Sequence, residues 1–314
     1  MDNRSTRIII LGGGFGGLYT ALHLEKTLAR DPNVEVTLVN KENFFLFTPM
    51  LHEVAASDLD ITHIVNPIRK MLKRVRFFDG DVESIDLESK RVVVSHGLEG
   101  QEHDHELEYD HLVLALGSIT NFFNLPGLQE RAITMKSLGD AIHLRNRLIE
   151  NLEEADFECA IGQRDHLLTV VIAGGGFAGV ETIASVNDFL REAIDFYPHL
   201  QEHHIRTVLV HPGALILPEL GEPLGRYTQQ QLAKRKVEIR VNTRVNGISE
   251  RGVELSDGTM IKANILVWTA GTSPNPLLKM LPCQKEKGRV VVNQFLEVPD
   301  WPGVWALADC AVIP

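Results

Sequence analysis

Two glycine-rich stretches contain the residues of this chain whose types and spacing are best suited to chemistry. They are Gly12-Gly13-Gly14-Phe15-Gly16-Gly17 and Gly174-Gly175-Gly176-Phe177-Ala178-Gly179. In such G-x-G-x-x-G motifs the first glycine makes a tight turn, the second lets a pyrophosphate approach the backbone, and the third lets a helix pack closely on a strand. Apolar runs at residues 7–11 and 168–173 precede the motifs, as buried parallel strands would. Two such sites predict two bound dinucleotides, and therefore a redox enzyme that pairs them.

The elements that must position these motifs recur in the same order along the chain. After the first motif we expect a helix at 18–28 and a strand at 34–39 that ends at Asn40, which completes a β-α-β unit. The second half repeats this pattern, and its expected elements are a helical run at 137–152 and strands at 207–211 and 265–271. Further strands are expected at 81–86, 91–94 and 109–118. The alternation predicts an α/β fold with two Rossmann-like dinucleotide-binding domains.

Composition excludes several classes of function. A length of 314 residues suits two domains, each with its own core. The net charge of -11 argues against nucleic acid as a partner, because a polyanion would be repelled. No run of about 18 apolar residues occurs, so no transmembrane helix is predicted. We expect an intracellular, cytoplasmic protein.

The cysteines and histidines carry no catalytic or metal-binding pattern. Cys159, Cys283 and Cys310 are widely spaced, which suits a reducing compartment and excludes the paired cysteines that disulfide reductases of this architecture need. Cys310 is expected to be a small buried hydrophobe. His199 and His203 have the i, i+4 spacing of a helical metal clamp but lie outside any known ligand signature, so no metal site is predicted.

Three further stretches carry a family resemblance. Residues 43–51, 268–271 and 303–311 resemble the corresponding stretches of type II NADH:quinone oxidoreductases. The resemblance implies that FAD binds to a split domain at 1–120 and 273–314, and that an NAD(P)H-binding domain at 121–272 is inserted between the two parts. It also implies hydride transfer from NADH to FAD and passage of two electrons to a quinone or other small acceptor, without proton pumping.

The resemblance assigns roles to residues of the FAD domain. Asn40 stands at the strand end where a carboxylate usually accepts both ribose hydroxyl hydrogens, and an amide accepts with its oxygen only. Thr48 and Pro49 are expected to border the isoalloxazine as catalytic residues, and Asp309 is expected to hold the ribityl chain. Leu116 and Ala308 depart from the family, which usually has a threonine and a glycine there. The other expected FAD contacts are Gly12, Gly14, Phe15, Gly16, Gly17, Lys41, Val82, Ala115 and Gly117.

In the second domain the resemblance places Glu181, two residues into the expected helix, near the nicotinamide as a catalytic residue. Its alternative role is a partner of the helix dipole, which stabilises such a carboxylate by about 0.3–1 kcal/mol. His211 stands where an NADH-specific site normally presents glutamate, so use of NADPH is left open. The other expected NAD(P)H contacts are Gly174, Gly176, Phe177, Ala178, Gly179, Ala270 and Gly271.

The chain ends at Pro314, before the helix, the quinone pocket and the membrane-docking region that the resemblance implies. We therefore expect a truncated form, whose longer parent is expected to contact the inner face of a membrane peripherally; a homodimer is left open. Two alternatives to the quinone reductase stay open. One is a soluble NAD(P)H diaphorase that reduces any acceptor reaching the flavin, and the other is a catalytically weak nucleotide-binding fragment or regulator.

Overall fold

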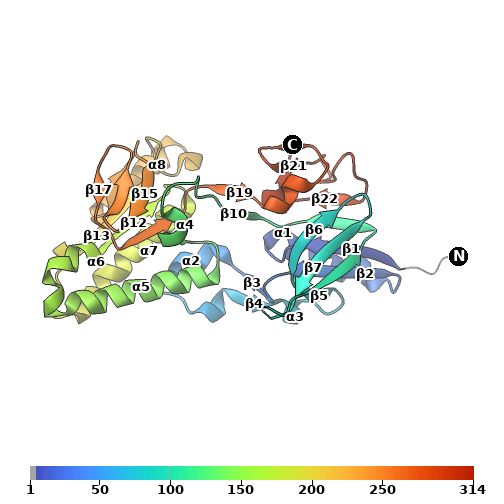
Figure 1. Ribbon diagram of the computed structural model, residues 1–314, viewed down its shortest axis with the longest axis horizontal. Helices are drawn as coiled ribbons and strands as arrows, with labels where there is room; N and C mark the ends of the chain where they lie inside the picture. Colours follow the sequence, from blue (N-terminus) through green and yellow to red (C-terminus); the bar gives the residue numbers. More distant parts are fainter. Residues whose placement is uncertain (1–4, 99) are drawn as a thin grey trace. The chain divides into compact units, whose positions relative to one another are not determined.

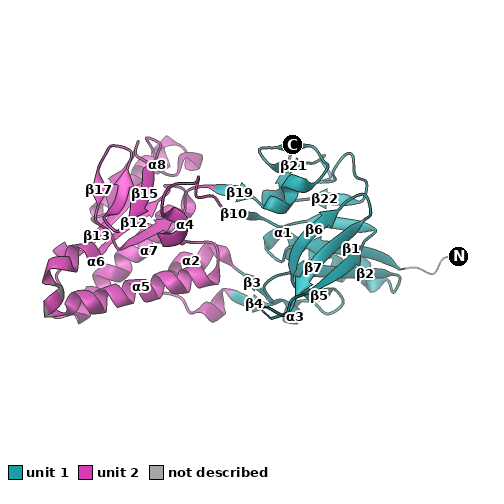
Figure 2. Cartoon of the chain, in the orientation of Figure 1, with its two compact units in different colours: residues 1–46, 65–119, 272–314 teal, residues 47–64, 120–271 magenta. Residues whose placement is uncertain are grey.

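A computed structural model describes residues 5–98 and 100–314 and divides the chain into two compact units. The first unit contains residues 1–46, 65–119 and 272–314, and the second contains residues 47–64 and 120–271 (Figure 2). Each unit is built around a five-stranded parallel sheet that carries one of the two glycine motifs.

The central sheet of the first unit has the strand order β22-β9-β1-β2-β5, and all its strands are parallel. Its strands are β1 (Thr6–Leu11), β2 (Val34–Asn40), β5 (Arg76–Asp79), β9 (His111–Leu114) and β22 (Val304–Ala306) (Figure 1). Helix α1 (Phe15–Lys26) leads from β1 to β2, whereas β9 pairs with the other side of β1. The strand order therefore reverses at β1, where an open α/β sheet binds its ligand.

Alternate residues of these strands face two different layers. Ile9, Leu11 and Leu112 pack against an antiparallel sheet in which Val92 and Val94 are fully buried. That sheet consists of β6 (Asp81–Asp86), β7 (Arg91–His96) and β8 (His103–Glu108). On the other face, α1 packs beside an apolar groove of about 460 Å³, whose lining includes Leu24, Val113, Trp305 and Leu307.

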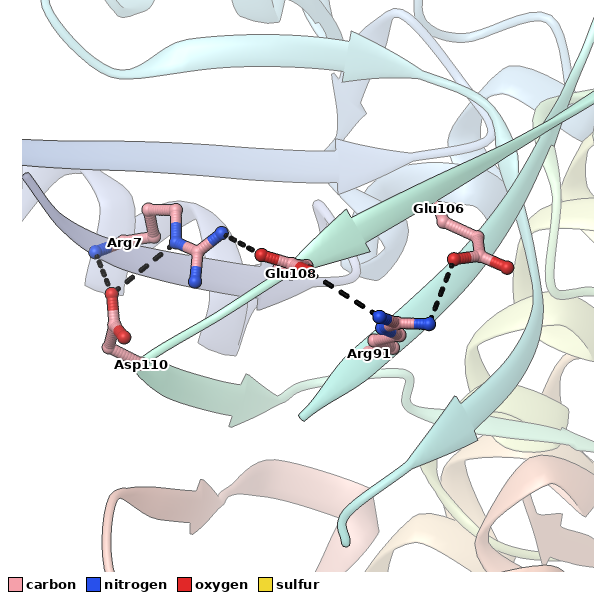
Figure 3. A network of polar contacts seen from close by, with 5 residues as sticks. All are labelled: Arg7, Arg91, Glu106, Glu108 and Asp110. Carbon is pink, nitrogen blue, oxygen red and sulfur yellow. Dashed lines mark hydrogen bonds and ion pairs between the residues drawn. The ribbon is translucent and has the colours of Figure 1, made fainter. Parts of the chain in front are cut away.

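An ion-pair chain ties the edge of the antiparallel sheet to β1 (Figure 3). The backbone N–H of Arg7 donates to Asp110 at 2.7 Å, and the Arg7 guanidinium donates to Glu108 at 2.6 Å. Arg91 lies 3.6 Å from the other oxygen of Glu108 and 3.4 Å from Glu106. Burial works to raise the pKa of Asp110, but the hydrogen bonds from Arg7 outweigh it and the pKa is lowered.

The remaining elements of the first unit are short. They are the pair β3 (Phe44–Leu46) and β4 (Val65–Pro67), helix α3 (Ile68–Met71), and a small sheet of β20 (Lys285–Glu286), β21 (Arg289–Val291) and β23 (Ala311–Val312). Strands β10 (Ser118–Thr120) and β19 (Thr272–Pro274) also pair with each other.

The second unit repeats the parallel sheet in the order β11-β18-β12-β13-β14. Its strands are β11 (Ile133–Thr134), β12 (Thr169–Ala173), β13 (Arg206–Val210), β14 (Glu238–Arg240) and β18 (Ile265–Trp268). Every residue of β12 and β18 is buried, as expected for strands covered on both faces. The sheet is covered in part by the antiparallel strands β15 (Val245–Ser249), β16 (Gly252–Leu255) and β17 (Met260–Ile261).

Helix α7 (Phe177–Ala193) follows the second glycine motif and leads from β12 to β13, as α1 does in the first unit. Helix α5 (Leu138–Asp156) begins with a capping box, in which the Ser137 hydroxyl accepts from the Asp140 N–H and the Asp140 carboxylate accepts from the Ser137 N–H. The other helices are α4 (Leu128–Arg131), α6 (Arg164–Leu167) and α8 (Glu222–Lys234).

The segment 47–64 packs with the second unit, although its neighbours in sequence belong to the first. Its helix α2 (Leu51–Ala55) contacts α5 and α7, and Leu51, Val54 and Ala55 are buried. The units divide at residues 119/120 and 271/272, next to the expected boundaries, but residues 1–120 were expected to form one unbroken part. The exception was not predicted, because sequence order alone does not reveal that these apolar residues are covered by helices more than 80 residues away.

The predicted fold class is confirmed, and the predicted elements form with small shifts at their ends. The helix expected at 18–28 runs from Phe15 to Lys26, and the helical run expected at 137–152 runs from Leu138 to Asp156. The strand expected at 265–271 ends at Trp268. Among the described residues, no helix is long and apolar enough to cross a membrane.

Two candidate dinucleotide cradles

The backbone of the first motif, between β1 and α1, has the shape that a pyrophosphate cradle needs. Gly12 has a φ of +102°, and a Cβ there would overlap the Ala115 carbonyl oxygen. A Cβ on Gly17 would overlap the carbonyl oxygen of Gly12, so α1 approaches β1 closely only because this residue is glycine. At Gly14, in contrast, nothing lies within 4 Å of the position that a Cβ would take, which leaves open space at the start of the helix.

The second motif has the same geometry. Gly174 has a φ of +119°, and a Cβ on Gly179 would overlap the Gly174 carbonyl oxygen. A Cβ on Gly176 would again have no atom within 4 Å. Gly14 and Gly176 are the N-cap residues of α1 and α7, and neither provides a capping side chain. The first N–H groups of both helices therefore remain suited to an anion such as pyrophosphate.

The neighbouring motif residues line the open side of each cradle. Phe15 and Phe177 are the first residues of their helices, and both side chains are exposed. Ala178 is also exposed, whereas Gly16 lies against Leu307 of the first unit. The second motif thus has alanine, Ala178, where the first has Gly16, but both motifs keep the open position that a dinucleotide requires.

The side chain at the end of the second strand of each unit bonds to the motif itself. The Asn40 side-chain oxygen accepts from the Gly13 N–H at 2.6 Å, and its amide nitrogen donates to the Glu42 carbonyl at 2.7 Å. In the second unit His211 Nδ1 accepts from the Gly175 N–H at 3.1 Å. Sequence reasoning assigned Asn40 to the ribose alone and overlooked Gly13 and Gly175, because a hydrogen bond to a neighbouring loop has no signature in the strand.

The His211 side chain is partly buried and hydrogen-bonded to the second motif. Burial lowers its pKa, and its Nδ1 accepts the hydrogen bond from the Gly175 N–H. The site therefore presents no negative charge where an NADH-specific site would have a carboxylate.

The other residues expected to contact FAD lie around the end of the first sheet. The Lys41 ammonium is paired with Asp81 at 3.0 Å, and the adjacent Val82 packs on the core of the unit. Ala115 is buried beside Gly12, whereas Gly117 has a φ of +69° and faces open space. Leu116, a departure from the family pattern, also packs on the core, so its side chain points away from an open site.

Asp309 lies on the short 3-10 helix η9 (Ala308–Cys310), which follows β22. Its carboxylate accepts a 2.6 Å hydrogen bond from Ser118, a residue that sequence reasoning missed because 191 positions separate the two. The preceding Ala308 has a φ of +56°, a left-handed conformation that favours the glycine of the family pattern. Cys310 is fully buried as expected, and burial raises the pKa of its thiol to about 11.

Glu181 occupies a different position from the one expected. Because α7 begins at Phe177, Glu181 is the fifth helical residue, and the first turn contains no acidic residue. A dipole effect falls off within the first turn, so it does not account for this carboxylate. Instead, Glu181 lies 3.8 Å from His52 Nε2 on α2, and His52 Nδ1 is held 3.0 Å from the hydroxyl of Ser185, one turn further along α7. Sequence reasoning missed both His52 and Ser185.

Thr48 and Pro49 lie on the 3-10 helix η2 (Thr48–Met50), and both are exposed. They belong to the same segment as His52, and this segment packs in the second unit. The structure therefore groups them with Glu181 in one unit, whereas the first motif belongs to the other.

A cavity of about 510 Å³ lies at the carboxyl ends of the strands of the second sheet. Gly174 of the motif contributes to its wall, as do Trp268 and the expected contact Ala270. The Gly271 position is covered by the ring of Phe123, which also lines the cavity. Arg244 is exposed at its edge, and sequence reasoning missed it because a lone arginine in a loop carries no signal.

The residues considered as metal ligands do not form a site. His199 precedes the 3-10 helix η6 (Glu202–His204) that contains His203, so the two do not share a helix. The backbone N–H of His199 donates to Asp156 at 2.8 Å. Within residues 5–98 and 100–314 there is no group of three or more side chains able to hold a metal ion.

Comparison with known proteins gives three findings. The family model described as pyridine nucleotide-disulphide oxidoreductase matches residues 6–314. The type II NADH:quinone oxidoreductase Ndh of Mycobacterium tuberculosis is 31% identical over 323 residues, a match that covers 99% of this chain and 68% of the relative. The external alternative NADH-ubiquinone oxidoreductase of Yarrowia lipolytica is 28% identical, and 56% of its length is covered.

Among solved structures, NDH2 from Plasmodium falciparum in complex with NADH has the same fold, with a TM-score of 0.90 at 24% identity. The match covers 99% of this chain and 65% of the solved chain. This chain thus spans between about half and about two thirds of the length of these relatives.

Proposed function

Because this chain belongs to the pyridine nucleotide-disulphide oxidoreductase family, and within it to the type II NADH:quinone oxidoreductases, we propose that it oxidises NADH with bound FAD and reduces a quinone. The observation that carries the proposal is the duplicated cradle. Gly14 and Gly176 leave the same open space at the start of a helix, and each motif sits at the carboxyl end of a parallel strand. Two cradles of this kind suit the two dinucleotides that such a reaction needs.

FAD is assigned to the first unit. The α1 N-terminus and the open face of Gly14 would hold its pyrophosphate, Asn40 and Lys41 would lie at the adenosine ribose, and Asp309 would hold the ribityl chain. When bound, flavin takes a hydride from reduced nicotinamide and passes two electrons to an acceptor. Asn40 Oδ1 already accepts the Gly13 N–H, so it retains one lone pair for a ribose hydroxyl. Ribose binding is therefore expected to be weaker than with a carboxylate.

NADH is assigned to the second unit, with its pyrophosphate at the N-terminus of α7. Glu181 is the residue proposed to orient the nicotinamide, and His52 is proposed to orient Glu181 because the bond to Ser185 directs its ring. Thr48 and Pro49, four and three residues before His52, are proposed to border the flavin. In this arrangement the protein works mainly by positioning two rings for hydride transfer, since little acid or base chemistry is required.

The second unit is also proposed to accept NADPH. The His211 imidazole carries no negative charge to repel a 2'-phosphate, and Arg244 lines the cavity at the strand ends with a cationic group. Among the described residues, the Arg244 side chain has no ion-pair partner within 4 Å and so is available to an anion. Guanidinium groups are well matched to phosphate.

A quinone is the proposed acceptor because the chain lacks the alternative route through thiols. Cys159, Cys283 and Cys310 are all free, and Cys310, which directly follows Asp309, is buried with a raised pKa. A buried neutral thiol is a poor nucleophile and does not relay electrons as a redox pair would. Peripheral contact with a membrane surface, and activity without proton pumping, belong to the same proposal.

The test is an absorption spectrum of the purified chain before and after anaerobic addition of NADH, followed by steady-state assays with a soluble quinone and with a dye. Flavin bands that bleach, together with quinone reduction, are the expected result. Dye reduction without quinone reduction would indicate the diaphorase. Nucleotide binding without bleaching, after reconstitution with FAD, would contradict the proposed activity of this chain and indicate a regulator.

A further inference from the structure

A second cavity lies in the same unit as the NADH cradle but at the opposite edge of its sheet. It has a volume of about 450 Å³ and is lined by Ile133 and Ile265, the first residues of β11 and β18. The glycine motif instead follows Ala173, the last residue of β12. Strands of four or five residues separate the two edges by about 15 Å, so this cavity is distinct from the nucleotide site.

The lining of the cavity contains basic residues, here called the rim, and apolar residues, here called the floor. Two arginines, Arg131 and Arg147, contribute guanidinium groups, and His143 and His166 contribute imidazoles. The floor is apolar and consists of Ile133, Ile248, Ala263, Ile265 and Leu266. Glu250 is the one acidic residue of the described lining, against two arginines, in a chain whose net charge is -11. A cavity of this size with a few convergent polar groups over an apolar wall is typical of a small-molecule site.

A buried polar network holds one of the arginines in place. Arg147 Nη2 donates to Asn264 at 3.3 Å, and Asn264 donates to the side chain of Asn151 at 2.8 Å. Asn151, which is only 3% exposed, donates in turn to the Leu167 carbonyl at 2.9 Å. Because both asparagine side chains of this network are hydrogen-bonded, the network is rigid, and the Arg147 guanidinium is already positioned before a ligand arrives.

The acidic partners of the two arginines are weak competitors. Arg131 lies 3.5 Å from Glu250, whose side chain is 88% exposed, and Arg147 lies 3.4 Å from the exposed Glu150. Exposed ion pairs of this kind contribute at most about 1 kcal/mol. An oxyanion that bonds to both guanidinium groups would readily displace these two glutamates, because guanidinium binds phosphate and carboxylate in a bidentate manner.

We propose that this cavity is a binding site for a small organic anion, a phosphate or carboxylate carried on an apolar body, separate from the dinucleotide sites. The oxyanion lies between Arg131 and Arg147, and the apolar body covers the isoleucine-rich floor. The site needs neither flavin nor turnover, so its occupancy is independent of the proposed redox activity.

The test uses phenyl phosphate as the probe and isothermal titration calorimetry as the readout, and each titration is run without NAD⁺ and with NAD⁺ at saturation to occupy the nucleotide cradle. Wild-type protein is expected to bind phenyl phosphate more tightly than inorganic phosphate, because only the former covers the floor. The double variant Arg131→Gln/Arg147→Gln is expected to bind at least about tenfold more weakly. Arg226→Gln is the matched control, since Arg226 is an exposed arginine of the same unit on α8 that pairs with Glu222 and is not part of this rim.

A gain-of-binding variant removes the ambiguity of a misfolded double variant. Glu250→Gln frees Arg131 from its competitor and is expected to tighten binding of phenyl phosphate about threefold. The proposal is overturned if the wild type shows no binding at about 10 mM probe, which is weaker than an ordinary small-molecule site. It is also overturned if Arg226→Gln weakens binding as much as the double variant, or if NAD⁺ abolishes binding and so places the probe in the nucleotide cradle.

Discussion

Ala308 is strained at the position that precedes the proposed flavin-binding aspartate, so its replacement by glycine should stabilise the protein. Its φ of +56° lies in the left-handed region, where an L-residue with a Cβ is disfavoured by about 1–2 kcal/mol. Glycine removes this strain but adds freedom to the unfolded chain, which costs about 0.4–1 kcal/mol. The expected net gain for Ala308→Gly is about 0.5–1 kcal/mol in the free energy of unfolding.

The gain is measured by urea unfolding of the FAD-free chain, and it corresponds to a rise in Tm of about 1–3 °C. Two control variants fix the interpretation. Ala193→Gly replaces an alanine with a φ of -64° at the end of α7, where glycine relieves no strain, and it should destabilise by about 1 kcal/mol. Lys90→Gly relieves similar strain, at a φ of +54°, in a turn far in sequence from the cradle, and it should stabilise without changing FAD affinity.

Ala308→Gly should also affect the first cradle. The Ala308 Cβ lies 3.4 Å from the position that a Cβ of Gly16 would take, so the methyl group lies beside the first turn of α1, which follows the proposed cradle. Its removal is expected to tighten FAD binding severalfold, as measured by flavin fluorescence on titration. A variant that is less stable than the wild type, or equally stable while Lys90→Gly gains stability, would refute the strain argument at this position.

Three further predictions follow from contacts described above. Glu181→Gln should lower kcat/KM for NADH about tenfold, and His52→Gln should lower it less while leaving FAD content unchanged. Equal rate constants of flavin reduction for wild type and Glu181→Gln in stopped-flow measurements would contradict the role proposed for Glu181. His211→Glu places a carboxylate where the imidazole stands, so the ratio of kcat/KM for NADPH to that for NADH should fall at least about tenfold, and an unchanged ratio would show that the 2'-phosphate lies elsewhere. The pKa of Asp110 is lowered in the folded state, so the contribution of this carboxylate to stability is present above its unfolded pKa and is lost as pH falls through the folded pKa. Asp110→Asn should therefore be less stable than the wild type at pH 7, by at most about 1 kcal/mol. In urea unfolding measured between about pH 5 and pH 2, the variant should lose less stability than the wild type as the pH falls.

Local features of the cradles were predictable from the sequence because they depend on residues close together in the chain. The glycines of each motif, the apolar strand before it and the helix after it interact over fewer than about 30 residues, so spacing alone carries the signal. The same holds for β2, whose apolar run ends at Asn40, and for α5, whose first turn begins with Ser137. The absence of a redox cysteine pair is likewise a matter of spacing.

The partners of the functional side chains were decided by tertiary structure. Ser118 reaches Asp309 across 191 positions, and His52 reaches Glu181 because a short helix from the first half of the chain packs on α7. The position of Glu181 in the second turn depended on where α7 begins, which the motif leaves uncertain by a few residues.

Sequence by itself determined where the two candidate dinucleotide cradles lie, since glycine is required wherever a positive φ or a close approach of helix and strand leaves no room for a side chain. Only the tertiary structure decided that the segment 47–64 joins the second unit, that His211 is partly buried and bonded to Gly175, and that Arg131 and Arg147 share a cavity. Burial and long-range hydrogen bonds set these properties, and both arise from residues that are distant in the chain and adjacent only in the folded protein.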